Sequence, residues 1–208
     1  MGEPFASFDE AWSSFLDRDE PLESFYEALP DEDSTLAVWL IEAAPAVKER
    51  ALAAQESLAR FDWIALLPAH FFHVTVHELG TELEEDEVEQ AVRVAREAWR
   101  DVQPFRIEYP RLTCFHEAVV AEGHTGGTEQ LRRGLGQDSV LHLPHLSLAY
   151  FRSAGASGAL RDVLAQRRET SLGEQDVDEV KLCLVPISKD RILEPWTVAG
   201  SIPLARRR

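Results

Sequence analysis

Short apolar runs and amphipathic stretches alternate along most of the chain. Strands are predicted where β-branched, aromatic and other apolar residues cluster, and helices where apolar residues recur every three or four positions. The predicted strands are residues 36–41, 61–67, 71–79, 105–109, 112–121, 143–151, 180–187 and 196–198. The predicted helices are residues 46–59, 84–99 and 160–168, with a further helix opened by Thr128. This alternation favours an α/β or α+β architecture, in which strands 105–109 and 112–121 are expected to pair.

The first 33 residues differ from the rest because they are acidic and rich in aromatic side chains. Phe8, Trp12, Phe15 and Leu16 follow helical spacing and predict a short amphipathic helix. We interpret residues 1–33 as an extension that packs its aromatic side chains on the main body. A lid or a partner-binding segment is the alternative interpretation.

Two of the predicted strands contain the same four-residue pattern: His, apolar residue, hydroxyl residue, apolar residue. Residues 73–76 read His-Val-Thr-Val, and residues 145–148 read His-Leu-Ser-Leu. Because side chains alternate between the two faces of a strand, each His shares a face with the hydroxyl residue two positions later. A single pattern of this kind is common by chance, and a lone His is more simply a buried imidazole bonded to the backbone. Two copies in one chain favour a shared functional site.

The paired tetrapeptides resemble the two motifs of the 2H phosphoesterase superfamily, which includes the RNA 2′,3′-cyclic phosphodiesterases, also called 2′-5′ RNA ligase-like proteins. Pro144 before the second motif and Ala149 after it also fit, and the resemblance covers residues 34–200. It implies an α+β, bilobal fold in which two antiparallel sheets flank a central cleft and helices lie on the outside. The expected organisation is an N-terminal extension over residues 1–33 and a single bilobal domain over residues 34–208.

The resemblance also implies the chemistry: a metal-independent phosphodiesterase, with no cofactor, that opens 2′,3′-cyclic phosphates or cleaves 2′-5′-linked nucleotides. His73 and His145 are the expected catalytic acid and base, a task that suits imidazole because its unperturbed pKa of about 6.5 lies near neutral pH. Thr75 and Ser147 are expected to hold the phosphate oxygens. Either His can be the base, depending on how the substrate is oriented. A non-catalytic nucleotide-binding or sensing module with the same fold is the alternative, and RNA 2′-5′ ligation is the reverse reaction.

Two phenylalanines are candidates to contact a substrate. Strict alternation places Phe71 on the face of His73 and Phe151 on the face of His145, so either ring could stack on a nucleobase. Core packing is the alternative for both. Among the other residues, Arg132 and Arg133 could supply positive charge near a phosphate, although exposed helix arginines are the commoner case.

A metal centre built from His70, His73 and His77 is not expected. The Val-Thr-Val sequence between the last two favours a strand, which would hold His73 and His77 about 13 Å apart at roughly 3.3 Å per residue. The sequence also lacks an HExxH motif and a phosphate-binding glycine loop that ends in Gly-Lys-Ser/Thr.

Composition narrows the class of protein. The 208 residues are 45% apolar and 28% charged, a balance typical of globular proteins. No apolar run approaches the roughly 20 residues needed to span a bilayer, and no secretory signal is recognised, so no membrane partner is expected. The two cysteines, Cys114 and Cys183, are not spaced as a CxxC pair and indicate reduced thiols. A cytoplasmic protein is therefore predicted.

The formal net charge of −16 opposes non-specific binding to a nucleic-acid backbone, which requires a basic surface. It favours a small nucleotide, or an RNA end carrying a cyclic phosphate, over extended nucleic acid, and it favours hydrolysis over ligation. An interaction protein that uses the aromatic N-terminal segment as its contact surface is a further alternative, with the partner protein unknown.

Overall fold

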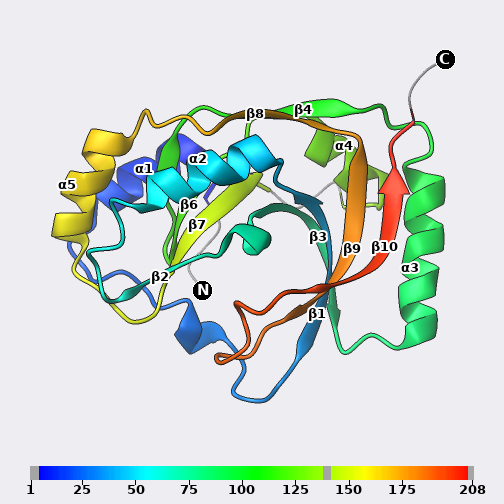
Figure 1. The fold of residues 1–208 in the computed structure, drawn as a ribbon, viewed down its shortest axis with the longest axis horizontal. Helices are drawn as coiled ribbons and strands as arrows, with labels where there is room; N and C mark the ends of the chain where they lie inside the picture. The colour runs from blue at the N-terminus through cyan, green and yellow to red at the C-terminus, as the bar shows by residue number, and fades with distance from the viewer. Residues whose placement is uncertain (1–4, 138–141, 206–208) are drawn as a thin grey trace.

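The computed structural model describes residues 5–137 and 142–205 (Figure 1). Its α-helices are α1 (Phe8–Asp17), α2 (Pro45–Gln55), α3 (Glu85–Ala98), α4 (Gly127–Gly134) and α5 (Ser157–Arg167), and its 3₁₀ helices are η1 (Tyr26–Ala28) and η2 (Ala69–Phe71). Its strands are β1 (Thr35–Glu42), β2 (Ile64–Leu66), β3 (His73–Thr81), β4 (Phe105–Tyr109), β5 (Leu112–Cys114), β6 (Ala118–Glu122), β7 (His145–Phe151), β8 (Gly173–Val177), β9 (Glu179–Pro186) and β10 (Thr197–Pro203).

Within these residues the main sheet has eight antiparallel strands, in the order β10-β9-β1-β3-β7-β6-β5, with β2 also paired to β7. Its two halves join where β3 meets β7 at the residue pair Val74 and Leu146. The predicted α+β fold with antiparallel sheets is confirmed. The strands expected on either side of a cleft form one continuous sheet at this junction, and the second sheet consists of β4 and β8.

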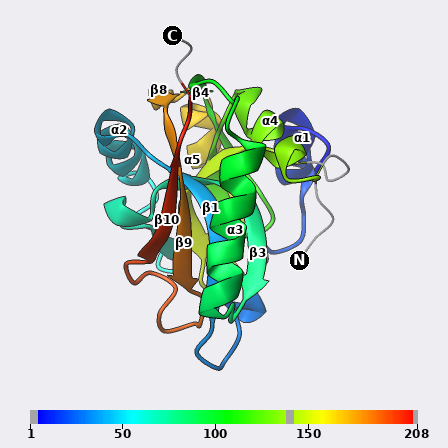
Figure 2. The same ribbon diagram turned by 90° about the vertical axis from the view of Figure 1, so that its right-hand side faces the viewer.

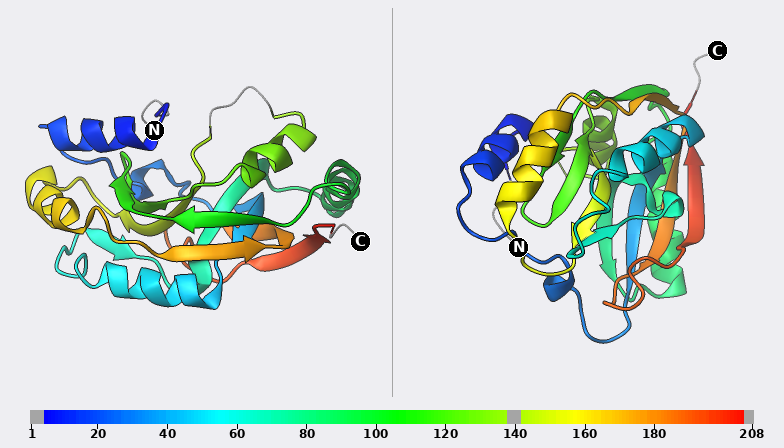
Figure 3. Two further views of the ribbon diagram at one scale, coloured as in Figure 1. Left: turned by 90° about the horizontal axis from the view of Figure 1, so that it is seen from above. Right: turned by 60° about the vertical axis from the view of Figure 1, so that its left-hand side comes forward.

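Helices lie around the outside of the sheets, as Figures 1 and 3 show. Helix α3 packs beside β10 at one end of the molecule, as Figure 2 shows from that side. Helices α1 and α5 lie together near β5 at the opposite end (Figure 1). The two His-containing strands therefore lie in the middle of the molecule, between its two ends.

Local sequence explains why α3 forms and where it packs. Glu84 and Glu87 form a capping box, in which each side chain accepts from the backbone N–H of the other and two free donors at the helix start are satisfied. Just after the helix, the Trp99 indole meets Trp39 of β1 edge-on, with ring centroids 4.9 Å apart. Its Nε1–H donates to the Leu131 carbonyl at 2.8 Å, so this buried polar group is satisfied. The helix is thus fixed to the sheet and to α4.

The expected pairing of strands 105–109 and 112–121 is wrong. Residues 112–121 contain a turn and give the hairpin of β5 and β6, whereas β4 pairs with β8, a strand that the sequence pattern did not predict. The β8 sequence, Gly-Glu-Gln-Asp-Val, lacks an apolar periodicity. Its pairing is supported instead by charge, because Arg106 of β4 contacts both Glu174 at 2.7 Å and Asp176 at 3.0 Å.

Strand β7 contains a β-bulge that changes which side chains face each side. Val119 of β6 pairs with Ala149, but the next residue, Val120, pairs with Ser147, so Leu148 is an extra residue in β7. An extra residue reverses the alternation of side chains beyond it. Residues after the bulge consequently occupy the opposite face from the one that strict parity predicts.

The predicted helix in the N-terminal segment is confirmed as α1. Its Phe15 is buried in the core and Trp12 packs against it, so aromatic side chains of this segment do lie against the body. Residues 1–4 of the predicted extension lie outside the described residues. The division at residue 33 stays a prediction. None of the helices in the described ranges is both long and apolar enough to cross a membrane. Cys114 and Cys183 are buried free thiols.

Candidate active site

The two sequence motifs flank the junction of the sheet symmetrically. His73 and His145 are the first residues of β3 and β7, and the residue after each of them forms the Val74–Leu146 pair. The same antiparallel register would set His73 across from Ser147 and Thr75 across from His145. Val74 and Leu146 are fully buried, so the four motif side chains lie on the opposite face. The structure thus brings all four groups into one cavity.

Each imidazole is held by the same local hydrogen bond. His73 Nδ1 donates to the Phe71 carbonyl at 2.7 Å, and His145 Nδ1 donates to the Leu143 carbonyl at 2.8 Å. Since a carbonyl oxygen only accepts, both neutral imidazoles carry their proton on Nδ1. Their Nε2 atoms are left as acceptors toward the cavity. This is the form in which an imidazole can act as a general base.

Aromatic rings fix the two imidazoles from the side. The Phe115 ring meets the His145 ring edge-on with centroids 4.9 Å apart, and the Trp196 ring meets the His73 ring edge-on with centroids 5.2 Å apart. The buried Phe71 ring also meets the His73 ring edge-on, with the ring centroids 5.4 Å apart. These neighbours pack the rings and remove water from around them. Trp196 was not identified from the sequence as a site residue, and no spacing rule placed Phe115 there.

The motif side chains open into a cavity of about 800 Å³. Among its described lining residues is one guanidinium, from Arg132 of α4, whose Nη1 donates to the Val76 carbonyl at 2.8 Å. Within the described ranges no carboxylate lies close enough to Arg132 to form an ion pair, so its charge is available to an anion. Arg133, by contrast, is exposed and pairs with Glu129. The two arginines that the sequence could not separate thus have different surroundings.

The surroundings keep both motif imidazoles neutral near pH 7. Burial lowers the pKa of His73 to about 4, against the opposing effect of the Phe71 carbonyl, and the nearby His145 lowers it further. Burial also lowers the pKa of His145, again opposed by its carbonyl partner. A bound phosphate anion would reverse this balance, because a negative charge beside an imidazole favours its protonated form.

Of the two aromatic residues predicted to contact a substrate, one lines the cavity and the other lies in the core. Phe71 is buried but contributes to the cavity lining beside His73. The placement of Phe151 on the cavity face is wrong, because the bulge at Leu148 turns its ring into the core, where it packs on Trp63 at 5.2 Å. Tyr150 takes the cavity-facing position instead.

His142 is a cavity residue without an assigned role in the sequence. Its Nε2 donates to the Thr75 carbonyl at 2.9 Å, which ties the segment before β7 to β3. Burial, followed by the charge of Arg132, lowers its pKa to about 4. The bond therefore helps to hold the two motif strands in register, and the ring stays neutral at physiological pH.

These depressed pKa values predict acid sensitivity. His73 and His142 bind protons in the unfolded chain near pH 6.5 but in the folded chain only near pH 4, so the free energy of unfolding should fall as the pH drops through that window. His142→Gln should reduce the drop by about 1–3 kcal/mol. Urea unfolding at pH 7.5, 5.5 and 4.5 measures it. His70→Gln is the matched control, and an equal drop in all three proteins would contradict the assignment.

The histidines considered as metal ligands have different surroundings. His70 is exposed in η2, and its Nε2 donates to the Leu193 carbonyl at 3.0 Å. His77 lines the cavity beyond Thr75. In residues 5–137 and 142–205 no group of three or more His, Cys, Asp or Glu side chains is arranged to hold a metal ion.

Comparison with known proteins identifies the fold. No protein-family model matches the chain, and no curated protein matches it. Several solved structures do match the chain. TT0787 of Thermus thermophilus has 19% identity and a TM-score of 0.63 over 81% of this chain and 97% of its own. E. coli LigT complexed with 3′-AMP has 16% identity and a TM-score of 0.64 over 83% and 99%. A protein described as a phosphoesterase has 16% identity and a TM-score of 0.62 over the same shares. The chain therefore has the fold of the 2H phosphoesterases, the superfamily that its paired motifs resemble.

Proposed function

We propose that this protein is a phosphodiesterase that opens 2′,3′-cyclic phosphates, or cleaves 2′-5′-linked nucleotides, by acid–base catalysis between His73 and His145. The observation that carries the proposal is the symmetry of the site. Two imidazoles with the same Nδ1–H···O=C bond flank one pair of residues in the sheet, each with a hydroxyl residue two positions later. The arrangement supplies two proton-transfer groups and two hydroxyl donors in one cavity.

In the proposed reaction one neutral imidazole accepts a proton from a water molecule through Nε2 while the water oxygen bonds to phosphorus. The other imidazole, protonated, donates its proton to the ribose oxygen as the bond between that oxygen and phosphorus breaks. Water is thereby added across one phosphorus–oxygen bond, and the product is a phosphate monoester. The two histidines exchange protonation states and return to the starting state through solvent.

Three groups can stabilise the phosphate during this reaction. Thr75 and Ser147 offer hydroxyl donors beside the imidazoles, and Arg132 offers a positive charge whose guanidinium is already fixed by the Val76 carbonyl. Donors held in place where negative charge increases stabilise the transition state more than mobile ones. The lowered pKa of Arg132 reflects its burial, and a bound anion would offset that cost.

Ligands of structural relatives support a nucleotide substrate. E. coli LigT has been crystallised with 3′-AMP, with ATP, with NADP⁺ and with phosphate. On these grounds we propose a small nucleotide or an RNA end with a cyclic phosphate as the substrate of this chain. Hydrolysis is the preferred direction, because joining two RNA ends would bring more phosphate charge to a protein with a net charge of −16.

The direct test is hydrolysis of the four nucleoside 2′,3′-cyclic monophosphates by purified protein in the presence of EDTA. We expect turnover that EDTA does not reduce, because the two imidazoles perform both proton transfers. The product, a 2′- or a 3′-phosphate, shows which ribose oxygen leaves. Binding of nucleotides by calorimetry without turnover of any cyclic or 2′-5′-linked substrate would favour the non-catalytic nucleotide-binding module.

A further inference from the structure

The N-terminal segment forms one wall of the cavity that holds the motif histidines. Four of its residues line that wall: Phe25, Ala28, Leu29 and Pro30. Apolar residues of β1, β9 and the loop after β9 continue this surface: Leu36, Val38, Val185, Ile187 and Ile192. The cavity thus has a polar part around the two imidazoles and an apolar part built largely by residues far from the motifs in sequence.

Backbone hydrogen bonds fix this wall to the end of β7. Phe25 N–H donates to the Phe151 carbonyl at 2.9 Å, and the Ser24 hydroxyl donates to the Arg152 carbonyl at 2.8 Å. Three residues before Phe25, the N–H of fully buried Leu22 donates to the Gly155 carbonyl at 3.0 Å. The segment therefore follows the strand that bears His145 and Ser147, and its position is set relative to them.

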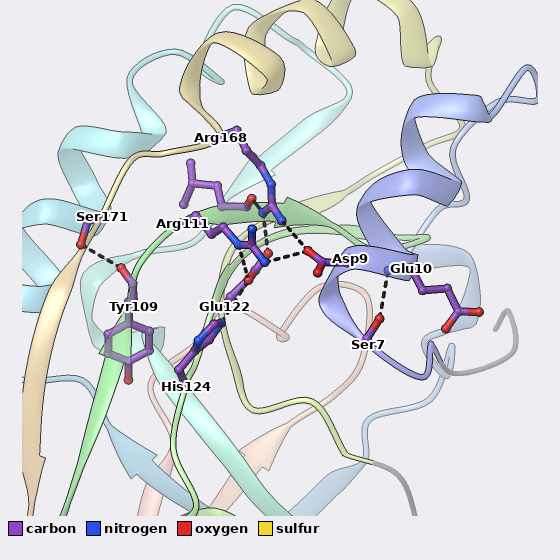
Figure 4. A network of polar contacts seen from close by, with 10 residues as sticks. Ser7, Asp9, Glu10, Tyr109, Arg111, Glu122, His124, Arg168 and Ser171 are labelled. Atoms are coloured by element: carbon purple, nitrogen blue, oxygen red, sulfur yellow. Dashed lines mark hydrogen bonds and ion pairs between the residues drawn. The ribbon is translucent and has the colours of Figure 1, made fainter.

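A second contact holds the segment through α1 (Figure 4). The Asp9 carboxylate lies 2.7 Å from Arg111, which also pairs with the fully buried Glu122 at 2.9 Å. Arg168 contacts Glu122 at 2.5 Å and covers the Trp12 ring, with its guanidinium carbon 4.6 Å from the ring centroid. Both α1 and residues 22–25 are thus attached to the body of the protein. The wall therefore has a fixed position in the cavity.

An aromatic stack connects the wall to β7. The Phe25 ring lies nearly parallel to the Tyr150 ring with centroids 3.8 Å apart, and Tyr150 lines the same cavity as Ser147, three residues earlier in β7. Both rings line the cavity. A flat aromatic group attached to a phosphate held at Ser147 would meet this surface. A nucleobase fits that description, because every base has a face that can stack on an aromatic ring.

The charge around the wall favours a substrate with a single phosphate. Residues 22–33 contain five acidic and no basic side chains, and three of the five pair with cations outside the segment: Glu23 with Arg18, Asp31 with Lys189 and Asp33 with Arg191. In the described part of the chain, the Asp, Glu, Lys and Arg residues that line the cavity are Glu78, Glu117 and Arg132, so carboxylates outnumber the guanidinium there. A chain of phosphates leaving the cavity over this surface would be repelled.

We propose that residues 22–30 are the nucleoside-binding wall of the active site and that they select nucleoside 2′,3′-cyclic monophosphates over cyclic-phosphate ends of longer RNA. This inference rests on the proposed function and adds the substrate class. Phe25, supported by Tyr150, contacts the base, and the acidic surface that follows excludes further phosphates.

The first test is Phe25→Ala, with Phe61→Ala as the matched control, because Phe61 is a partly buried aromatic residue outside the cavity. The reference substrate is ethylene phosphate, a five-membered cyclic phosphate that has no nucleoside. We expect Phe25→Ala to lower the ratio of kcat/KM for adenosine 2′,3′-cyclic monophosphate to that for ethylene phosphate about tenfold, through KM, as expected for loss of one stacking contact. Phe61→Ala should leave the ratio unchanged. An unchanged ratio in Phe25→Ala would overturn the proposal.

The second test compares the mononucleotide with a pentanucleotide that ends in a 2′,3′-cyclic phosphate. The wild-type protein should prefer the mononucleotide by about tenfold or more at low salt, and added salt should narrow this difference because it screens the repulsion. An equal or higher kcat/KM for the pentanucleotide would overturn the single-phosphate selection.

Binding separates this inference from the proposed function. Calorimetry with 3′-AMP needs no turnover, and Phe25→Ala should weaken that binding about tenfold while Phe61→Ala should not. Suppose that the wild-type protein hydrolyses no cyclic phosphate, but that Phe25→Ala binds 3′-AMP more weakly than the wild type does. The proposed function is then wrong, and the assignment of residues 22–30 as a nucleoside-binding wall is supported. If the protein is active and Phe25→Ala binds 3′-AMP as tightly as the wild type does, the nucleoside-binding role of residues 22–30 is wrong and the proposed function is supported.

Discussion

His73→Ala and His145→Ala should each lower kcat for cyclic phosphate hydrolysis by about 10²–10⁴-fold, the usual contribution of a positioned general acid or base. The reason is that each imidazole, held by its Nδ1–H bond to a backbone carbonyl, directs Nε2 to the same cavity. Initial rates at saturating substrate measure the effect. The double variant should lose much less than the product of the two single losses, because the residues act as a unit.

His70→Ala is the matched control for this prediction. His70 lies close in sequence to the first motif, but it is exposed, bonds to the Leu193 carbonyl and does not line the cavity. Its loss should leave kcat within about twofold of the wild type, as for a surface residue remote from the chemistry. Circular dichroism and urea unfolding check that each variant is folded. A folded His73→Ala or His145→Ala protein with wild-type kcat would contradict two-histidine catalysis.

Thr75→Val and Ser147→Ala should each lower kcat by about 10²-fold, the lower end of the effect of removing one fixed donor to developing negative charge. Valine keeps the shape of threonine and alanine nearly that of serine, so the loss reports the hydroxyl group. The effect should appear in kcat, because the donor is needed most when charge on the phosphate oxygens is greatest. Steady-state kinetics with a nucleoside 2′,3′-cyclic monophosphate separates kcat from KM.

Thr197→Val provides the control for removal of a strand hydroxyl, because Thr197 begins β10 on an exposed part of the sheet and lies outside the cavity lining. It should leave both constants unchanged. A rise in KM with kcat unchanged in Thr75→Val or Ser147→Ala would mean that the hydroxyls bind the substrate and the transition state equally. That outcome would assign them to binding and leave the acceleration to the imidazoles.

The sequence by itself determined the central part of this site. The alternation of side chains along a strand depends only on local backbone geometry, so His73 with Thr75 and His145 with Ser147 could be assigned to shared faces without knowing the fold. The duplication of the motif then indicated one site. Helix α3 could also be predicted from the sequence, because its capping residues and apolar spacing are local signals.

Pairing between distant segments was decided by the tertiary structure. Strand β8 has no apolar alternation, and it becomes a strand by pairing with β4, which buries Gln175 and Val177 and sets Arg106 beside its exposed acidic side chains. Likewise, the parity argument failed at Phe151 because the bulge at Leu148 arises from the register between β6 and β7. A bulge depends on the partner strand, and a single strand's sequence carries little sign of it.

The composition of the cavity was also decided in three dimensions. Arg132 and Arg133 are neighbours with the same chemistry, yet the packing of α4 buries one beside the site and leaves the other in solvent. The N-terminal segment showed its aromatic character in the sequence, whereas its position against β7 follows from backbone bonds to residues more than a hundred positions away. Local periodicity determined the catalytic candidates, and long-range packing decided what surrounds them, because burial and register depend on contacts that no local pattern encodes.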